Sequence, residues 1–128
     1  TMQMGTQVVP DTSLDPDKLY DILYVPGGVG SGVIATDPQV LELVRRHHEQ
    51  GRVVAANCSG VGVLARAGVL SGLPATSVAA VARGLRNEGF NIPTSRRMWV
   101  VNPQARIWTA TVSYWVNGSA VALVSSYF

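Results

Sequence analysis

The sequence contains one cysteine, Cys58, within the stretch RVVAANCSGVGVLARAGVL, residues 52–70. A buried strand that turned tightly into a helix at Cys58 would present its thiol above the sheet, at the positive end of the helix. That position favours the thiolate, which is the nucleophilic form of cysteine. The sequence therefore predicts a catalytic nucleophile at Cys58. The alternative is that Cys58 is a small core residue, since free cysteine is often fully buried.

Two glycine-rich junctions, VPGGVGSG and ANCSGVG, could supply hydrogen-bond donors beside this thiol. The carboxyl ends of parallel strands meet at one edge of a sheet, where ligands bind. The backbone amides of Gly27, Gly28 and Ser59 would then face the space in front of Cys58. Such amides could hold negative charge that develops on a substrate, as in an oxyanion hole. The Ser59 hydroxyl could also donate a hydrogen bond beside the nucleophile.

A competing interpretation concerns residues 60–65, GVGVLA, which match the dinucleotide fingerprint G-x-G-x-x-G/A. That fingerprint needs an acidic residue about 20 positions further on to bind the ribose. The sequence places Val and Ala there, and the first carboxylate in that region belongs to Glu88. No histidines and carboxylates show metal-ligand spacing. We therefore expect neither a nucleotide cofactor nor a metal.

Other polar and aromatic residues are weaker candidates for the site. His47 and His48 fall late in a predicted helix, where a cation interacts favourably with the helix dipole, so we place them on a solvated face and not among the catalytic bases. One hydroxyl at the end of a late strand could reach the site, from Thr109, Thr111 or Ser113. The tryptophans are expected in core and hairpin packing: Trp99, Trp108 and Trp115.

Apolar runs and turn residues indicate the elements that would position these groups. Strands are predicted at residues 6–9, 22–25, 52–57 and 75–77, and a hairpin joins 98–102 to 105–112. Asp37 and Pro38 predict the start of a helix that Gly51 ends. Further helices are predicted from Cys58, up to Gly89 and over the C-terminal segment. Strands alternating with helices predict an α/β three-layer sandwich with a mostly parallel sheet.

Composition limits the classes of protein to which the chain can belong. We expect its 128 residues to form one domain, 1–128, and 47% hydrophobic content is enough for a sizeable core. A net charge of +2 and dispersed basic residues argue against a nucleic-acid partner. No apolar run approaches the roughly 20 residues of a membrane span, and the N-terminus lacks a signal-peptide pattern. One cysteine indicates a reducing compartment, so we expect a cytoplasmic protein.

The motifs together resemble the DJ-1/PfpI superfamily, which has a glutamine-amidotransferase-like, flavodoxin-like fold. The relevant stretches are DILYVPGG, the helix opened by Asp-Pro, and VVAANCSGVGVLARAGVLSGLPAT. The isonitrile hydratase-like branch is the most similar, with Cys-Thr-Gly, A-G-L-L-x-G and A-T where this chain has CSG, AGVLSG and AT. RIWTATVS also resembles that branch's late strand, I-x-T-S-x-G-V-S. The resemblance implies that Cys58 is the nucleophile and that the amides of Gly27, Gly28 and Ser59 form the anion pocket.

The chain departs from this family in three places. The histidine that often follows the A-T is absent, and the late family glycine is Thr111. Tyr114 and Trp115 stand where small residues are expected and could fill the pocket. The family domain also begins with a strand–helix–strand unit that carries an acidic partner of the cysteine. We expect this chain to correspond to the C-terminal two-thirds of the fold.

The predicted activity is that of a cysteine-dependent hydratase or hydrolase acting on a small electrophilic molecule, as the isonitrile hydratase-like branch does. The alternative is a non-catalytic binding or regulatory subunit. A parallel sheet without its first strands exposes an unpaired edge, and the apolar C-terminal segment adds to the exposed surface. We therefore expect a homodimer or a complex with a separate N-terminal chain, unless a divergent fold has rebuilt the core.

Overall fold

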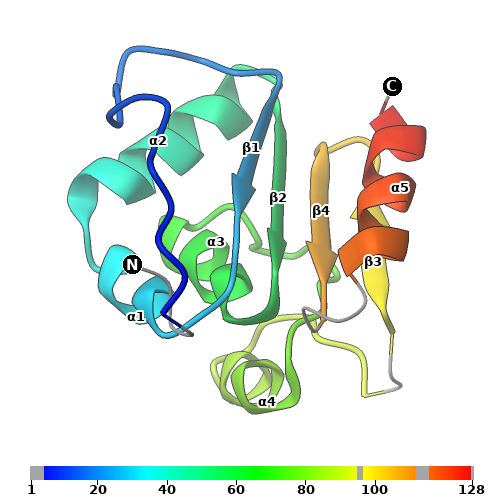
Figure 1. Ribbon diagram of the computed structural model, residues 1–128. Helices are drawn as coiled ribbons and strands as arrows, with labels where there is room; N and C mark the ends of the chain where they lie inside the picture. The colour runs from blue at the N-terminus through cyan, green and yellow to red at the C-terminus, as the bar shows by residue number, and fades with distance from the viewer. Residues whose placement is uncertain (1–4, 95–96, 112–115, 128) are drawn as a thin grey trace.

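The computed structural model describes residues 5–94, 97–111 and 116–127, which form a sheet with helices on both faces (Figure 1). The elements in chain order are β1 (Ile22–Val25), α1 (Gly30–Ile34), α2 (Pro38–Glu49), β2 (Val53–Asn57), the 3₁₀ turn η1 (Cys58–Gly60), α3 (Val61–Ala67), α4 (Ala79–Asn87), β3 (Trp99–Asn102), β4 (Ile107–Ala110) and α5 (Val116–Tyr127). No helix within these ranges is long and apolar enough to cross a bilayer.

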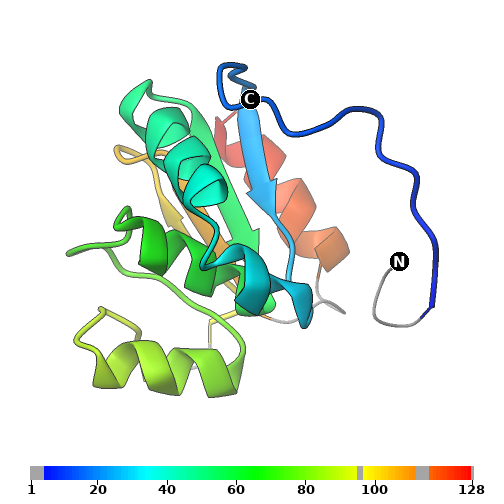
Figure 2. The same cartoon turned by 90° about the vertical axis from the view of Figure 1, so that its left-hand side faces the viewer.

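The sheet has four strands in the order β1-β2-β4-β3. β1, β2 and β4 run parallel, with Val25 opposite Ala56 and Asn57 opposite Ala110. β3 is antiparallel to β4 and forms the predicted hairpin. Helices α2 and α3 cover one face, α5 covers the other, and α4 lies beyond the carboxyl ends of the strands (Figures 1 and 2). The predicted α/β class with a mostly parallel sheet is confirmed.

β2 lies in the centre of the molecule, and all five of its residues are buried. Val54 and Ala56 pack toward α2 and α3, in a large apolar cluster that includes Leu64. Val53 and Ala55 face the opposite side, in a smaller cluster around Trp108 and Leu123. Burial on both faces explains why this strand reads as a continuous apolar run, without the alternation of a half-exposed strand.

Helix α2 begins and ends as its sequence predicts. Asp37 is its N-cap, and the Asp37 carboxylate accepts a hydrogen bond of 2.9 Å from the amide of Gln39. Pro38 takes the first helical position, where its missing N–H costs nothing. Gly51 follows the helix with a φ of 71°, a left-handed conformation that glycine adopts without strain.

Two predicted strands do not form, and one helix was not predicted. Residues 6–9 form no strand, because no described neighbour pairs with them and an isolated strand has no hydrogen-bond partners. Residues 75–77 do not join the sheet. Instead the Ala75 amide donates to Asn91 O, and the Thr76 amide donates to Thr109 Oγ1. The glycine-rich segment after β1 forms the short helix α1.

The aromatic residues lie only partly as predicted. Trp108 is fully buried between the sheet and α5, which confirms its place in the core. Trp99 belongs to the hairpin, but its side chain is exposed on the edge strand β3. Trp115 lies outside the described residues. In α5, Leu123 is buried against the sheet, whereas Val121 and Val124 are exposed, so the apolar C-terminal segment adds to the exposed surface only in part.

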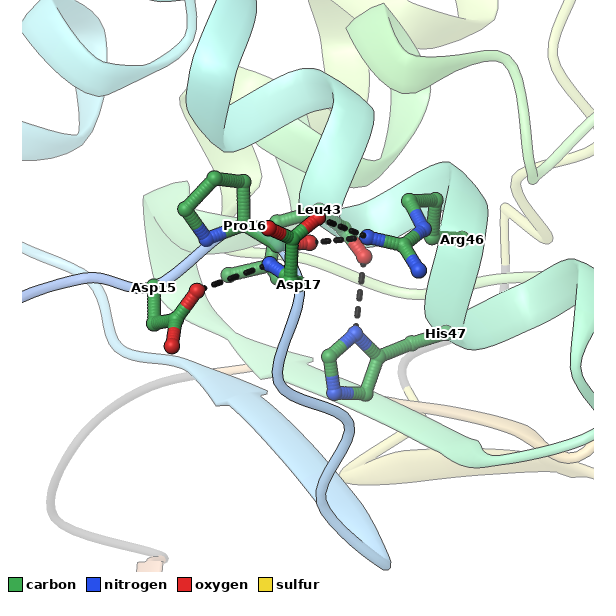
Figure 3. A network of polar contacts seen from close by, with 6 residues as sticks. All are labelled: Asp15, Pro16, Asp17, Leu43, Arg46 and His47. Carbon is green, nitrogen blue, oxygen red and sulfur yellow. Dashed lines mark hydrogen bonds and ion pairs between the residues drawn. The ribbon is translucent and has the colours of Figure 1, made fainter.

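The prediction that His47 lies on a solvated face is also wrong, because its ring is completely buried under the N-terminal segment. Its Nδ1 lies 2.8 Å from Leu43 O, and its Nε2 accepts a hydrogen bond of 3.0 Å from the Tyr20 amide. Beside it, Arg46 donates to Pro16 O and contacts Asp17 (Figure 3). A neutral imidazole protonated on Nδ1 satisfies both contacts of His47. This network fastens residues 15–20 to α2.

We predict that His47→Ala lowers the free energy of unfolding by about 1–3 kcal/mol, because the Tyr20 amide loses its acceptor. The neighbouring change His48→Ala is the matched control. His48 is only partly buried, and its Nδ1 has no hydrogen-bond partner among the described atoms, so we expect a loss below about 1 kcal/mol. Urea denaturation of both variants measures the difference. Equal losses would show that the Tyr20 contact contributes nothing.

Candidate functional site

Cys58 lies at the sharp turn that leads from β2 into η1 and α3, at the carboxyl edge of the parallel strands. Its φ is 52°, in the left-handed region that favours glycine. Within the described ranges, Arg106 is the other non-glycine residue with a positive φ. Such a conformation costs about 1–3 kcal/mol and persists only where the surrounding structure enforces it. The thiol is half-buried and forms no disulfide.

Two glycines enforce this conformation by letting the β1 turn pack directly on the Cys58 turn. A Cβ on Gly60 would lie 2.4 Å from Val25 O and 2.7 Å from Pro26 O. A Cβ on Gly27 would lie 2.6 Å from the Cβ of Cys58 and 3.1 Å from its Sγ. Both positions therefore need glycine for close packing. This contact accounts for the first glycine of the 60–65 motif without a nucleotide.

The structure brings the predicted site residues Gly27, Gly28, Cys58 and Ser59 together, but two of their amides are engaged within the protein. The Gly27 amide donates to Asn57 Oδ1 at 3.2 Å. The Gly28 amide donates to Ser59 Oγ at 3.0 Å. A bound substrate would therefore have to replace these internal acceptors before it could use either amide. The Ser59 amide belongs to the first turn of η1, where backbone N–H groups have no acceptor within the helix.

The Ser59 hydroxyl belongs to a small network of polar groups between the two turns. It lies 3.1 Å from Gly28 O and 2.9 Å from Ser31 Oγ, and the Ser31 hydroxyl lies 2.7 Å from Gly28 O. Ser59 therefore connects η1 to the start of α1 through its side chain. The predicted hydrogen bond beside the nucleophile is not formed in this arrangement, because the hydroxyl faces Gly28 and Ser31.

Tyr24 is a further candidate for the site, and the sequence pattern does not indicate it. Burial disfavours the phenolate and raises the pKa of Tyr24 above its usual 10.0, and the nearby charge of the Cys58 thiolate raises it further. Tyr24 is therefore a neutral phenol at neutral pH, and its hydroxyl can donate a hydrogen bond. In the sequence it is one residue of an apolar run, and only its parallel pairing with β2 brings it near the cysteine.

The late hydroxyls have structural contacts. Thr109 is buried, and its Oγ1 accepts from the Thr76 amide. The Thr111 hydroxyl lies 3.4 Å from Met98 O, to which it donates. Ser113, Tyr114 and Trp115 lie outside the described residues, so the prediction that bulky side chains fill the pocket stays a prediction.

A hollow of about 290 Å³ lies between α1, α3 and α4. Ser31, Ser59 and Gly62 form part of its lining, together with Arg66 and Glu88, which are 4.0 Å apart. Cys58 is not among the lining residues, so this hollow is distinct from the space in front of the thiol. In the part of the chain that the structure describes, no three His, Cys, Asp or Glu side chains gather in a way that could hold a metal ion.

The sharp turn at Cys58, the order of the strands and the sequence together place the chain in a known family. The model of the DJ-1/PfpI family matches residues 1–112, and the chain belongs to this family. A ThiJ/PfpI domain protein from Brachyspira murdochii has a similar structure, with a TM-score of 0.76 at 25% identity over 88% of this chain and 62% of that one.

Two curated relatives indicate the range of chemistry within the family. An isonitrile hydratase from Pseudomonas putida is 38% identical over 77 residues, which are 60% of this chain and 34% of the relative. A deglycase from Thermococcus kodakarensis is 32% identical over 76 residues, which are 59% of this chain and 45% of the relative. The chain therefore spans less than half the length of either relative.

We predict that Gly60→Ala destabilises the protein by at least about 1–3 kcal/mol, because the new Cβ would collide with backbone oxygens of the β1 turn. Gly62→Ala, one residue into α3, is the matched control. Its Cβ would meet nothing within 4 Å, so alanine should raise helix stability by about 0.5–1 kcal/mol. Thermal unfolding measures both. A Gly60→Ala variant as stable as the wild type would rule out the tight contact.

Proposed function

We propose that this protein is a cysteine-dependent hydratase or hydrolase that acts on a small electrophilic molecule, with Cys58 as its nucleophile. The observation that carries the proposal is the left-handed backbone of Cys58 at the carboxyl edge of the sheet. Strain of this kind is typical of functional sites. Family membership and the isonitrile hydratase and deglycase relatives support the same class of chemistry.

With an isonitrile, the proposed reaction begins when Cys58 Sγ bonds to the terminal carbon. That carbon takes up a proton, which gives a thioimidate. Water then adds across the C=N bond. The C–S bond breaks, a formamide leaves and the thiol is restored, so that one water is consumed for each isonitrile. An aldehyde or acyl substrate would use the same attack at a carbonyl carbon, with the developing charge on oxygen.

Tyr24 and the turn amides have distinct proposed roles in this reaction. Tyr24 is a candidate hydrogen-bond donor near Cys58, because burial disfavours its phenolate and keeps the hydroxyl protonated. The Ser59 amide is the candidate donor to developing negative charge. The Gly28 amide would also donate to this charge when the substrate replaces the Ser59 hydroxyl as its acceptor. The Gly27 amide would do so when the substrate replaces Asn57 Oδ1.

A non-catalytic binding or regulatory subunit is the second candidate. The internal acceptors on the Gly27 and Gly28 amides favour it. Along the described ranges, no carboxylate forms a hydrogen bond with the Cys58 thiol, whereas the family resemblance implies an acidic partner. A binding subunit would retain its small molecule unchanged, and its affinity would survive loss of the thiol.

We predict that Cys58→Ala reduces turnover of an isonitrile or a dicarbonyl to the uncatalysed rate, because covalent catalysis has no substitute for its nucleophile. Ser59→Ala should only weaken turnover, since the backbone amide of residue 59 remains. Steady-state kinetics, with circular dichroism to verify the fold, test both changes. If Cys58→Ala turned over either substrate as fast as the wild type, the proposed mechanism would be wrong.

We also propose that the protein works as a homodimer, or as a complex with a separate chain that supplies the N-terminal part of the domain. β1 is the edge of the sheet, so one side of its backbone lacks a strand partner within the described structure. On the far side of the sheet, Val121 and Val124 of α5 are exposed. Covering about 600 Å² of apolar surface would contribute on the order of 15 kcal/mol before the costs of association.

Analytical ultracentrifugation of the purified protein tests this assembly. We expect a sedimentation coefficient that rises with concentration to that of a dimer. If the protein is instead monomeric by itself, adding the separate chain should produce a faster-sedimenting complex. A protein that remained monomeric and soluble across the whole concentration range, both alone and with the separate chain, would contradict the proposal.

A further inference from the structure

Ser77 contacts the Cys58 turn from a distant part of the chain. Its hydroxyl donates a hydrogen bond of 2.6 Å to the Cys58 carbonyl oxygen, across 19 positions of sequence. Ser77 is 4% exposed, so water does not compete effectively for this contact. The bond therefore ties the residue that carries the thiol to the segment between α3 and α4.

The segment that carries Ser77 is held by the sheet. The Thr76 amide donates to Thr109 Oγ1 of β4 at 2.9 Å, and Asn102 Nδ2 of β3 donates to Pro74 O at 2.9 Å. The Thr76 hydroxyl donates to Arg97 O at 3.1 Å. These contacts fix both the backbone and the side chains around Ser77. The position of the hairpin therefore determines where the Ser77 hydroxyl meets the Cys58 turn.

The Ser77 bond is not required to satisfy the Cys58 carbonyl. The amide of Val61 also donates to Cys58 O, at the end of η1. Loss of the Ser77 hydroxyl therefore leaves that carbonyl with a partner, and the global stability should change little. What is lost is the contact that fixes this left-handed residue from the side of the hairpin.

We propose that Ser77 is a positioning residue, which holds Cys58 Sγ in its reactive orientation through the Cys58 carbonyl. The proposal rests on the proposed function only in taking Cys58 as the reacting group. In this role Ser77 acts through its hydrogen bond to the Cys58 carbonyl oxygen. It controls how often the thiol points at the electrophile, and thus affects kcat more than KM.

The test compares Ser77→Ala with Ser77→Thr, which retains the hydroxyl, and with Ser126→Ala. Ser126 is the matched control, because its hydroxyl also donates to a backbone carbonyl at 2.6 Å, that of Ala122, on the exposed side of α5. Since Cys58 is the only cysteine in the chain, the rate of alkylation by iodoacetamide reports its reactivity directly. Turnover of an isonitrile gives kcat and KM separately.

We expect Ser77→Ala to lower the alkylation rate and kcat by about tenfold, less than the hundredfold cost of a 1 Å displacement, with KM and the melting temperature nearly unchanged. Ser77→Thr should restore both rates, and Ser126→Ala should match the wild type. Wild-type rates in a folded Ser77→Ala variant, or failure of a folded Ser77→Thr variant to restore them, would overturn the proposal.

Two further results keep this test decisive. If Ser77→Ala does not fold, Thr109→Val replaces it. That variant loosens the segment that carries Ser77 and should also slow alkylation, so an unchanged rate would overturn the proposal. If alkylation falls in Ser77→Ala while the wild type turns over no substrate, the positioning role stands and the proposed function fails.

Discussion

The contact between the turn after β1 and the turn after β2 determines the geometry of the rest of the site. The two backbones approach so closely that neither Gly27 nor Gly60 has room for a Cβ. This approach places Gly27 against the side chain of Cys58 and lets Ser59 bond across to Gly28. It also stabilises the left-handed backbone of Cys58, which would otherwise relax. The thiol, its neighbouring amides and the start of α1 are therefore fixed as one unit.

The burial of the sheet and the geometry of the Cys58 turn depend on each other. β2 ends at Cys58 and is buried on both faces, so any movement of the turn would have to move a strand packed into two apolar clusters. Close-packed interiors resist such movement. On the hairpin side, the contact from Ser77 adds a polar constraint to this apolar one. The orientation of the thiol is thereby set by elements from three separate parts of the chain.

Much of this arrangement could be predicted from local sequence. The apolar run before Cys58, the glycines around it and the cap of α2 are short-range signals, and each has a direct physical meaning. The burial of His47 could not be read in the same way, because it depends on a segment 27 residues earlier that folds over α2. The internal acceptors on the Gly27 and Gly28 amides depend on contacts across 30 and 31 positions. Residues 6–9 have the composition of a strand, but pairing requires a neighbour that composition does not supply.

Residues 5–20 contribute no strand to the sheet, and the part of this segment that precedes β1 is attached to α2. The Tyr20 amide donates to His47 Nε2, and the Arg46 guanidinium donates to Pro16 O. A protease that removed this segment would therefore expose a fully buried imidazole, while the pairing of β1 with β2 would remain intact.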